Sequence, residues 1–112
     1  MKYDSIALTE AVYYILLALH EPLHGYGIMQ KTELLSSGRV KLAAGTLYGA
    51  LNTLLEKGWI RTLPGETGSR KKEYTITPEG REMAKNELSR LKELVQNGET
   101  IITKQGDGQI CG

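Results

Sequence analysis

The chain has 112 residues and a formal net charge of +1, which fits one small domain and excludes a protein that binds polyanions over its whole surface. Its longest apolar run, residues 11–19, is far shorter than the roughly 20 residues of a membrane-spanning helix. The start of the chain lacks the features of a signal peptide and the one cysteine, Cys111, cannot form an internal disulfide, so we expect a cytoplasmic protein without a cysteine metal cluster.

The positive charge is concentrated in the middle of the chain. Residues 1–35 carry a net charge of −2, residues 36–72 carry +5 and residues 73–112 carry −2. A local excess of lysine and arginine is what binding to phosphates requires, although such clusters are also common on ordinary solvated surfaces.

The first predicted helix begins after Thr9, which can cap it, and runs to about Leu19. Its middle is apolar on every side, so it must be covered all round. We expect one side to pack on the core through Leu8, Val12, Ile15 and Leu19. The rest would need a neighbouring subunit, and the predicted interface on this helix consists of Ala11, Tyr14, Ile15 and Ala18.

A proline at position 22 separates this helix from a second one over residues 26–35, with Ile28, Met29, Thr32 and Leu35 predicted on its inner side. Apolar and polar residues alternate over Val40–Leu42, which predicts a short strand that pairs with the hairpin described below. His20 and His24 have no acid, thiol or third histidine at ligand spacing, so we interpret them as loop or helix-end residues and predict no metal site.

Residues 40–60 contain the helix on which the functional prediction depends. Apolar residues recur at helical spacing on one side, at Ala43, Leu47, Ala50, Leu51, Leu54 and Leu55. The other side has no large apolar residue and carries Gly45, Gly49, Asn52, Thr53 and Glu56, flanked by Thr46 and Tyr48. A surface of small and hydrogen-bonding groups can approach a DNA major groove closely.

Two strand-like runs follow, residues 59–63 and 72–76, and a glycine-containing loop joins them. Arg70, Lys71 and Lys72 place three cations at the end of that loop. The order helix, strand, basic loop, strand is typical of a winged helix-turn-helix, in which the hairpin is the wing. We expect these cations to hold DNA phosphates, the alternative being an ordinary solvated hairpin.

Thr77-Pro78-Glu79 predicts the start of a last helix. A short coiled-coil seam follows, with apolar residues at Ala84, Leu88, Leu91 and Val95 and a further one at Ile102. Asn97-Gly98 either ends this helix or interrupts it. We therefore divide the chain into a DNA-binding domain (residues 1–77), a dimerisation helix (78–104) and a flexible tail (105–112).

The predicted fold is mostly α with a small β-hairpin, a winged helix-turn-helix followed by a dimerisation helix. The predicted DNA-binding residues are Tyr26, Lys41, Gly45, Thr46, Tyr48, Gly49, Asn52, Thr53, Arg70, Lys71 and Lys72. The predicted function is sequence-specific binding of double-stranded DNA by a homodimer. The alternative is a winged-helix adaptor that binds proteins instead; no catalytic constellation or cofactor motif indicates an enzyme.

The combination GTLY (residues 45–48), EKGWI (56–60) and KKEYTITPEG (71–80) resembles the PadR family of bacterial transcriptional regulators, as do Leu16–Leu19 and His24–Ile28. The resemblance covers roughly residues 6–97. It implies a dimeric winged-helix repressor that binds an inverted-repeat operator, and a small-molecule effector that releases the DNA in many members. The family pattern usually has proline after GTLY, where this chain has Gly49.

Overall fold

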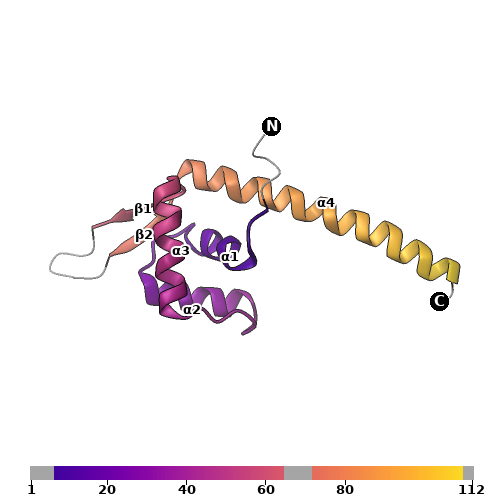
Figure 1. Cartoon of the computed structure of the whole chain (residues 1–112), viewed down its shortest axis with the longest axis horizontal. Coiled ribbons are helices and arrows are strands. Elements are labelled where there is room, and N and C mark those ends of the chain that lie inside the picture. Colours follow the sequence, from indigo (N-terminus) through magenta and orange to yellow (C-terminus); the bar gives the residue numbers. More distant parts are fainter. Residues whose placement is uncertain (1–6, 65–71, 110–112) are drawn as a thin grey trace. The chain divides into compact units, whose positions relative to one another are not determined.

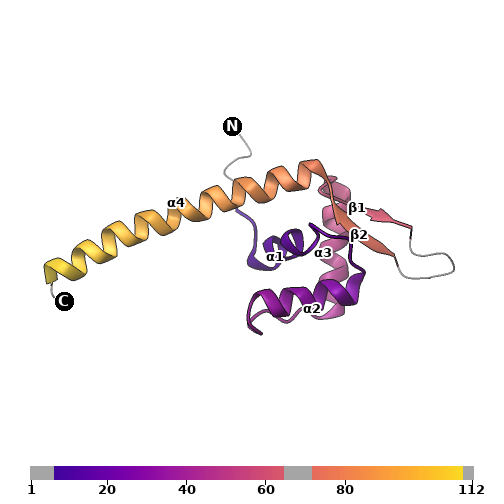
Figure 2. The same ribbon diagram turned by 180° about the vertical axis from the view of Figure 1, so that it is seen from behind.

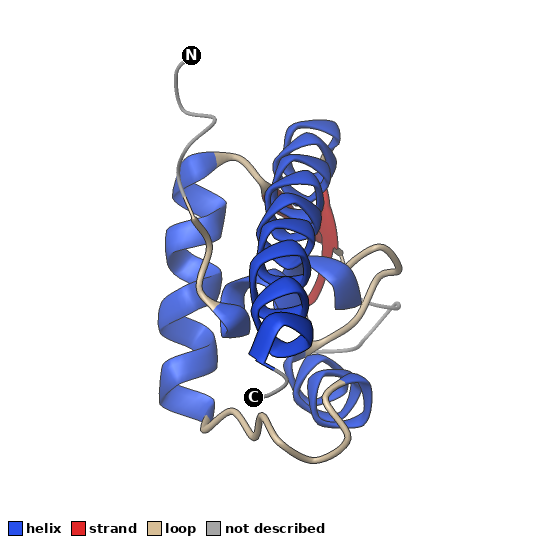
Figure 3. Ribbon diagram, turned by 90° about the vertical axis from the view of Figure 1, so that its right-hand side faces the viewer, coloured by secondary structure: helices blue, strands red, loops and turns tan. Residues whose placement is uncertain are grey.

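A computed structural model describes residues 7–64 and 72–109. Helices make up most of the described chain and the strands form one hairpin (Figures 1 and 3). In chain order the elements are α1 (Glu10–Ala18), α2 (Gly25–Leu35), α3 (Ala44–Lys57), β1 (Ile60–Leu63), β2 (Glu73–Ile76) and α4 (Pro78–Gln109). This is the predicted mostly helical winged helix-turn-helix with a long C-terminal helix.

The chain divides into two compact units. One is Leu8–Ala84, and the other includes Lys85–Gln109. The first turns of α4 therefore belong to the same unit as the hairpin, whereas the division made from the sequence starts a separate segment at residue 78.

The helix boundaries follow from identifiable caps. Thr9 accepts a hydrogen bond from the Val12 amide at 3.1 Å and starts α1 as predicted. At the end of α3, Gly58 adopts φ +78°; its amide donates to the Leu55 carbonyl and the next amide donates to Leu54. This Schellman arrangement requires a residue that tolerates the left-handed conformation, which glycine does without a steric cost.

β1 and β2 pair in antiparallel register, with Ile60 opposite Ile76 and Thr62 opposite Tyr74. The other edge of β2 is occupied by Leu23, whose amide and carbonyl exchange two hydrogen bonds with Tyr74 at 3.1 and 2.8 Å. The predicted pairing of Val40–Leu42 with the hairpin is wrong. That segment is not a strand, because Ser36 at the end of α2 accepts a hydrogen bond from the Val40 amide at 2.9 Å and ties it to α2.

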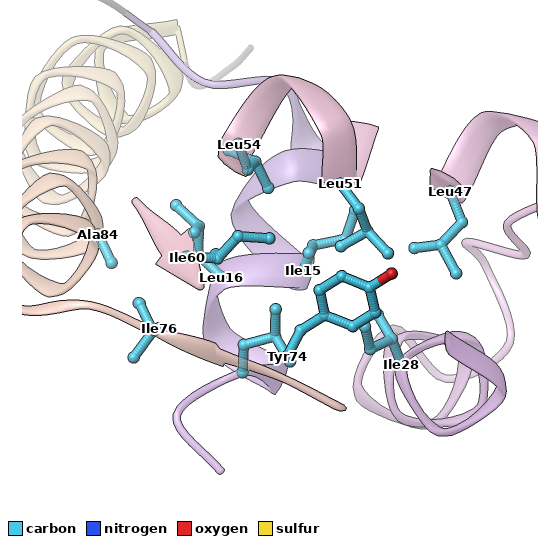
Figure 4. Close-up of a cluster of buried hydrophobic side chains, with 11 residues drawn as sticks. Ile15, Leu16, Ile28, Leu47, Leu51, Leu54, Ile60, Tyr74, Ile76 and Ala84 are labelled. Atoms are coloured by element: carbon cyan, nitrogen blue, oxygen red, sulfur yellow. The ribbon is translucent and has the colours of Figure 1, made fainter. Parts of the chain in front are cut away.

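One apolar cluster holds the Leu8–Ala84 unit together (Figure 4). It joins side chains from all three short helices, both strands and the start of α4, namely Ile15, Leu16, Leu19, Ile28, Leu47, Leu51, Leu54, Ile60, Tyr74, Ile76 and Ala84. The predicted inner side of α2 is confirmed for Ile28 and Thr32, which are fully buried. It is wrong for Leu35, which is 43% exposed because α2 ends there at the edge of the cluster.

α4 runs without interruption through Asn97 and Gly98 (Figure 2). Its start is fixed by Thr77, whose hydroxyl accepts from the Gly80 amide at 3.1 Å and donates to the Gly58 carbonyl at 2.7 Å. The helix extends to Gln109, so most of the predicted flexible tail (residues 105–112) is helical, and residues 110–112 lie outside the described part. No helix in residues 7–64 or 72–109 combines the length and the apolar character needed to cross a membrane.

Candidate nucleic-acid interface

The two sides of α3 differ as the sequence predicts. Leu47, Leu51 and Leu54 are at most 2% exposed and form part of the core, with Ala50 and Leu55 partly buried beside them. The predicted apolar residue Ala43 lies one position before the helix and is exposed. The opposite side is exposed throughout at Gly45, Thr46, Tyr48, Gly49, Asn52 and Thr53, and we call these six residues the α3 surface.

The two glycines leave the α3 surface without side chains at residues 45 and 49, so the helix backbone is accessible there. A Cβ atom at Gly45 or at Gly49 would meet nothing within 4 Å, so both backbone positions face open space. The Thr53 hydroxyl donates to the Gly49 carbonyl at 3.2 Å, which keeps that side chain against the helix. The Asn52 amide is therefore the largest polar group that projects from the middle of this surface, and it can bond in a bidentate manner to an adenine edge.

The N-terminus of α2 meets α3 at Tyr48. A Cβ atom on Gly25 would lie 2.1 Å from the Tyr48 hydroxyl oxygen, so the absence of a side chain at residue 25 is what lets this ring approach. Tyr26, the next residue, is 61% exposed and Tyr48 is 45% exposed. The structure therefore brings two of the predicted DNA-binding residues, from separate helices, to one place.

His24 caps α2, and its Nδ1 atom accepts from the Gly27 amide at 3.2 Å. The His20 Nδ1 atom lies 2.9 Å from the Leu16 carbonyl oxygen at the end of α1. Both histidines are thus helix-end residues, as interpreted from the sequence. Within the described ranges, no three histidine, cysteine or acidic residues come together as a metal site.

The predicted cations are only partly within the described structure. Lys41 is exposed in the segment before α3, and Lys72 is exposed directly before β2. Arg70 and Lys71 lie outside the described residues. Arg39, nearby in sequence, forms an ion pair with Glu10, which lowers the pKa of that carboxyl group through the hydrogen bond between them.

The sequence analysis missed two features of this region. Arg61 on β1 is an exposed cation on the wing, and its position directly after the apolar Ile60 is the signal that could have identified it, because successive side chains of a strand face opposite sides. The amides of Gly25 and Tyr26 also form no hydrogen bond within the described chain, because they occupy the first turn of α2. The sequence gives little indication of this second feature, since histidine is not a typical N-cap residue.

A pocket of about 580 Å³ lies among α2, α3 and β2. Four predicted DNA-binding residues line it, Tyr26, Tyr48, Asn52 and Lys72, together with Gly25 and the capping His24. Tyr74 from β2 also contributes to the lining. Of the remaining predicted contacts, those within the described residues lie on α3 or just before it.

The predicted dimer residues fall into two groups. Ile15, Ala18 and Ala84 are at most 5% exposed in the single chain, so they have almost no surface to offer a partner and are corrected to core residues. Ala11, Tyr14 and Leu91 are partly exposed, and Leu88 and Val95 are 43% and 58% exposed. For these five residues the dimer interface stays a prediction.

Comparisons with known proteins show which family this chain matches. The model of the transcriptional regulator PadR-like family matches residues 14–86. An uncharacterized 37.1 kDa protein in transposon TN4556 of Streptomyces fradiae is 40% identical over 73 residues, which are 65% of this chain and 20% of that protein. The chain thus corresponds to about a fifth of the length of that curated relative.

Solved structures show the same fold. A PadR-like transcription factor from Bacteroides fragilis is 29% identical, with 80% of this chain and 87% of the other aligned at a TM-score of 0.65. A transcriptional regulator from Clostridium thermocellum is 26% identical, with 84% and 89% covered at a TM-score of 0.62. A PadR family regulator from Clostridium difficile, 19% identical, aligns over 84% and 99% of the two chains at a TM-score of 0.71.

The family match spans well over half of the chain and includes α2, α3 and the hairpin. The family is one of transcriptional regulators, and the neighbours from Clostridium thermocellum and Bacteroides fragilis are a transcriptional regulator and a transcription factor. The protein belongs to the PadR-like family of DNA-binding transcriptional regulators.

Proposed function

We propose that the protein binds an inverted-repeat operator as a homodimer and represses transcription by occupying it. The observation that carries the proposal is the α3 surface, which is exposed, free of aliphatic side chains larger than threonine and backed by the buried Leu47, Leu51 and Leu54. A major groove admits an α-helix of this kind, and a polar side with little bulk lets the backbone come close to the base edges.

The residues divide into base-reading and phosphate-binding groups in this proposal. Asn52 reads an adenine edge, whereas Thr46, Tyr48 and Thr53 lie nearer the DNA backbone. Lys41, Lys72 and Tyr26 contact flanking phosphates, and the proposal includes Arg70 and Lys71 in the same role. Gly45 and Gly49 contribute by leaving room for the groove.

The dimer is supported by an exposed apolar stripe on α4. Leu88, Leu94, Val95, Ile101 and Ile102 are between 43% and 72% exposed on one helix. Leu88, Leu91, Val95 and Ile102 also follow the spacing of a coiled-coil seam. Exposed apolar side chains in such a row mark an interaction surface, and a second copy of α4 matches the pattern. Two-fold symmetry then sets the half-sites about one helical turn apart.

Selection of bound sequences from random duplexes tests the function directly. We expect an enriched palindrome with two half-sites. A protein-binding adaptor would enrich no sequence, and a single unpaired site would contradict the homodimer.

Fluorescence anisotropy with the selected duplex tests the division of roles. Asn52→Ala should cost about 1–3 kcal/mol and relax the preference at one base pair. Lys41→Gln should weaken all sequences alike and reduce the salt slope by about 1. Lys104→Gln removes the same charge far along α4 and serves as the control. Equal salt slopes and equal loss of sequence preference for Asn52→Ala and Lys41→Gln would contradict the assignment.

Light scattering tests the dimer independently of DNA. Val95→Lys places a charge within the apolar stripe and should shift the protein toward monomer. Ser89→Lys places the same charge at an exposed position outside the stripe and should leave the mass unchanged. A dimer that tolerates Val95→Lys would show that α4 does not form the interface through this stripe.

A further inference from the structure

Gly25 is a buried glycine at a position where the backbone does not require one. It is the first residue of α2 and its φ is not positive, so an alanine could adopt the same backbone conformation. Alanine is also the better helix former. The reason for the missing side chain therefore lies in what surrounds residue 25 and not in its own conformation.

The ring of Tyr48 occupies the space where a side chain on Gly25 would be. A Cβ atom on Gly25 would lie 2.1 Å from the hydroxyl oxygen, 2.8 Å from Cζ and 3.4 Å from Cε1 of Tyr48, the three nearest atoms outside its own stretch of chain. Because unstrained contacts between such atoms begin at about 3.5 Å, the hydroxyl end of the ring would have to retreat by more than about 1 Å.

The other glycines of α2 and α3 do not show this arrangement. At Gly27 a Cβ atom would meet a methyl group of Leu23 at 3.3 Å, which a small adjustment relieves. At Gly45 and at Gly49 it would meet nothing within 4 Å. Among these four glycines, Gly25 is the one that leaves space for a residue of the other helix.

The ring that fills this space belongs to the α3 surface. Tyr48 and Asn52 are four residues apart on α3, and side chains at that spacing are neighbours on a helix. Both of them line the pocket of about 580 Å³ among α2, α3 and β2, as does Gly25, and all three lie in the Leu8–Ala84 unit. A Tyr48 ring that leaves Gly25 therefore moves within the space that Asn52 also faces, or outward over the α3 surface.

We propose that Gly25 is a positioning residue for DNA binding. Because it has no side chain, it seats the hydroxyl end of Tyr48 against the N-terminus of α2, which fixes the ring on the α3 surface and keeps the approach to Asn52 open. Gly25 contacts no base and acts only through Tyr48. The proposal rests on the proposed role of the α3 surface in reading DNA.

Gly25→Ala should affect DNA binding far more than stability. Its methyl group presses on the outer end of a side chain that is 45% exposed, and such an end can shift without opening the core. We expect a melting temperature within about 5 °C of the wild type, a small change for a domain of this size. A larger loss would show that Gly25 supports the fold itself, and would overturn the positioning role.

Nuclear magnetic resonance on the full chain without DNA tests the contact. We expect a nuclear Overhauser effect between an Hα atom of Gly25 and the ring Hε atoms of Tyr48, assigned by its loss in Tyr48→Ala. Gly25→Ala should shift the ring resonances of Tyr48, whereas Gly27→Ala, the matched control on the same helix, should leave them in place. Absence of the Overhauser effect in the wild type would overturn the proposal whether or not the protein binds DNA.

Fluorescence anisotropy with the selected duplex tests the consequence for binding. Gly25→Ala should weaken the duplex at least fivefold, and Gly27→Ala less than twofold. In a Tyr48→Ala background the change Gly25→Ala should alter the affinity by less than twofold, because the side chain through which it acts is gone. A fivefold loss that persists in this background would show that the new methyl group acts on its own, which contradicts the proposal.

Selection from random duplexes separates positioning from a simple loss of folded protein. A smaller amount of active protein binds fewer duplexes but prefers the same sequences. A displaced Tyr48 ring should instead relax the preference at the base pair that Asn52→Ala affects. A Gly25→Ala protein that binds as tightly and as selectively as the wild type refutes the positioning role alone, whereas a wild type that selects no sequence refutes the proposed function on which this role rests.

Discussion

Gly80 offers the sharpest test of how the hairpin and the start of α4 are joined. A Cβ atom on this residue would lie 2.0 Å from the backbone carbonyl oxygen of Trp59 and 2.8 Å from the Ile76 side chain. A backbone carbonyl cannot rotate away as a flexible side chain can, so Gly80→Ala must push α4 away from the β1 corner. Thr77 bonds to Trp59 and Gly58 across this joint, at 3.0 and 2.7 Å, and those bonds would lengthen.

The expected cost combines three effects. Overpacking costs about 1–3 kcal/mol, and a backbone clash belongs at the upper end of this range. A weakened hydrogen bond costs about 1 kcal/mol. The higher helix propensity of alanine relative to glycine offsets about 1 kcal/mol of this loss of stability. The net destabilisation is about 2–3 kcal/mol, which lowers the melting temperature of a domain of this size by roughly 10–20 °C.

Thermal unfolding followed by circular dichroism measures this effect, with Gly49→Ala as the matched control. Gly49 also lies in a helix, but its Cβ direction is open, so alanine there should raise stability by about 0.5–1 kcal/mol. A melting temperature for Gly80→Ala within about 2 °C of the wild type, far less than the expected loss, would show that the joint is not as tightly packed as the structure indicates.

Three further changes have defined outcomes. The Thr32 hydroxyl is buried without a hydrogen bond, so Thr32→Val should raise the free energy of unfolding in urea by about 1 kcal/mol, and a loss would indicate a hidden partner. Gly98 lies within α4 with open space around it, so Gly98→Ala should increase the helical circular dichroism signal and stabilise the helix by about 0.5–1 kcal/mol. Arg39 lowers the pKa of Glu10 from 4.5, so the ion pair stabilises the fold above that pH and its contribution is lost as the pH falls through the lowered pKa. Arg39→Gln should therefore destabilise the protein at pH 7 more than at pH 3, and equal losses at the two pH values would contradict this.

The sequence predicted α3 well because two independent patterns agree there. Leucines recur at helical spacing on one side, and Gly58 marks the end of the helix at the residue where the structure has it. The hairpin was also predictable, since both strands are short runs of β-forming residues and the first begins just after that glycine. Both signals come from residues that are close together in the sequence, so they can be recognised without knowing the tertiary contacts.

The errors concern contacts between distant residues. Leu23 and the Val40–Leu42 segment both place apolar residues in the connections between helices, and nothing local indicates which of them reaches Tyr74. Ile15 and Ala18 belong to a helix that is apolar all round, and periodicity cannot tell which sides the chain itself covers. The sequence does not decide whether α4 passes through Gly98, because the cost of one glycine, about 1 kcal/mol, is small in a helix with many other residues to sustain it.

The candidate site depends on one of these distant contacts. Gly25 and Tyr48 are far apart in sequence, yet the hydroxyl of Tyr48 lies where a side chain on residue 25 would be. The position of that ring on the α3 surface is therefore set by the N-terminus of α2. Tyr48 is 45% exposed and its hydroxyl is the outer end of a side chain, so a Cβ atom added at residue 25 would press on the ring and not on the core. Gly25→Ala would therefore move the Tyr48 ring, and through it would change the α3 surface.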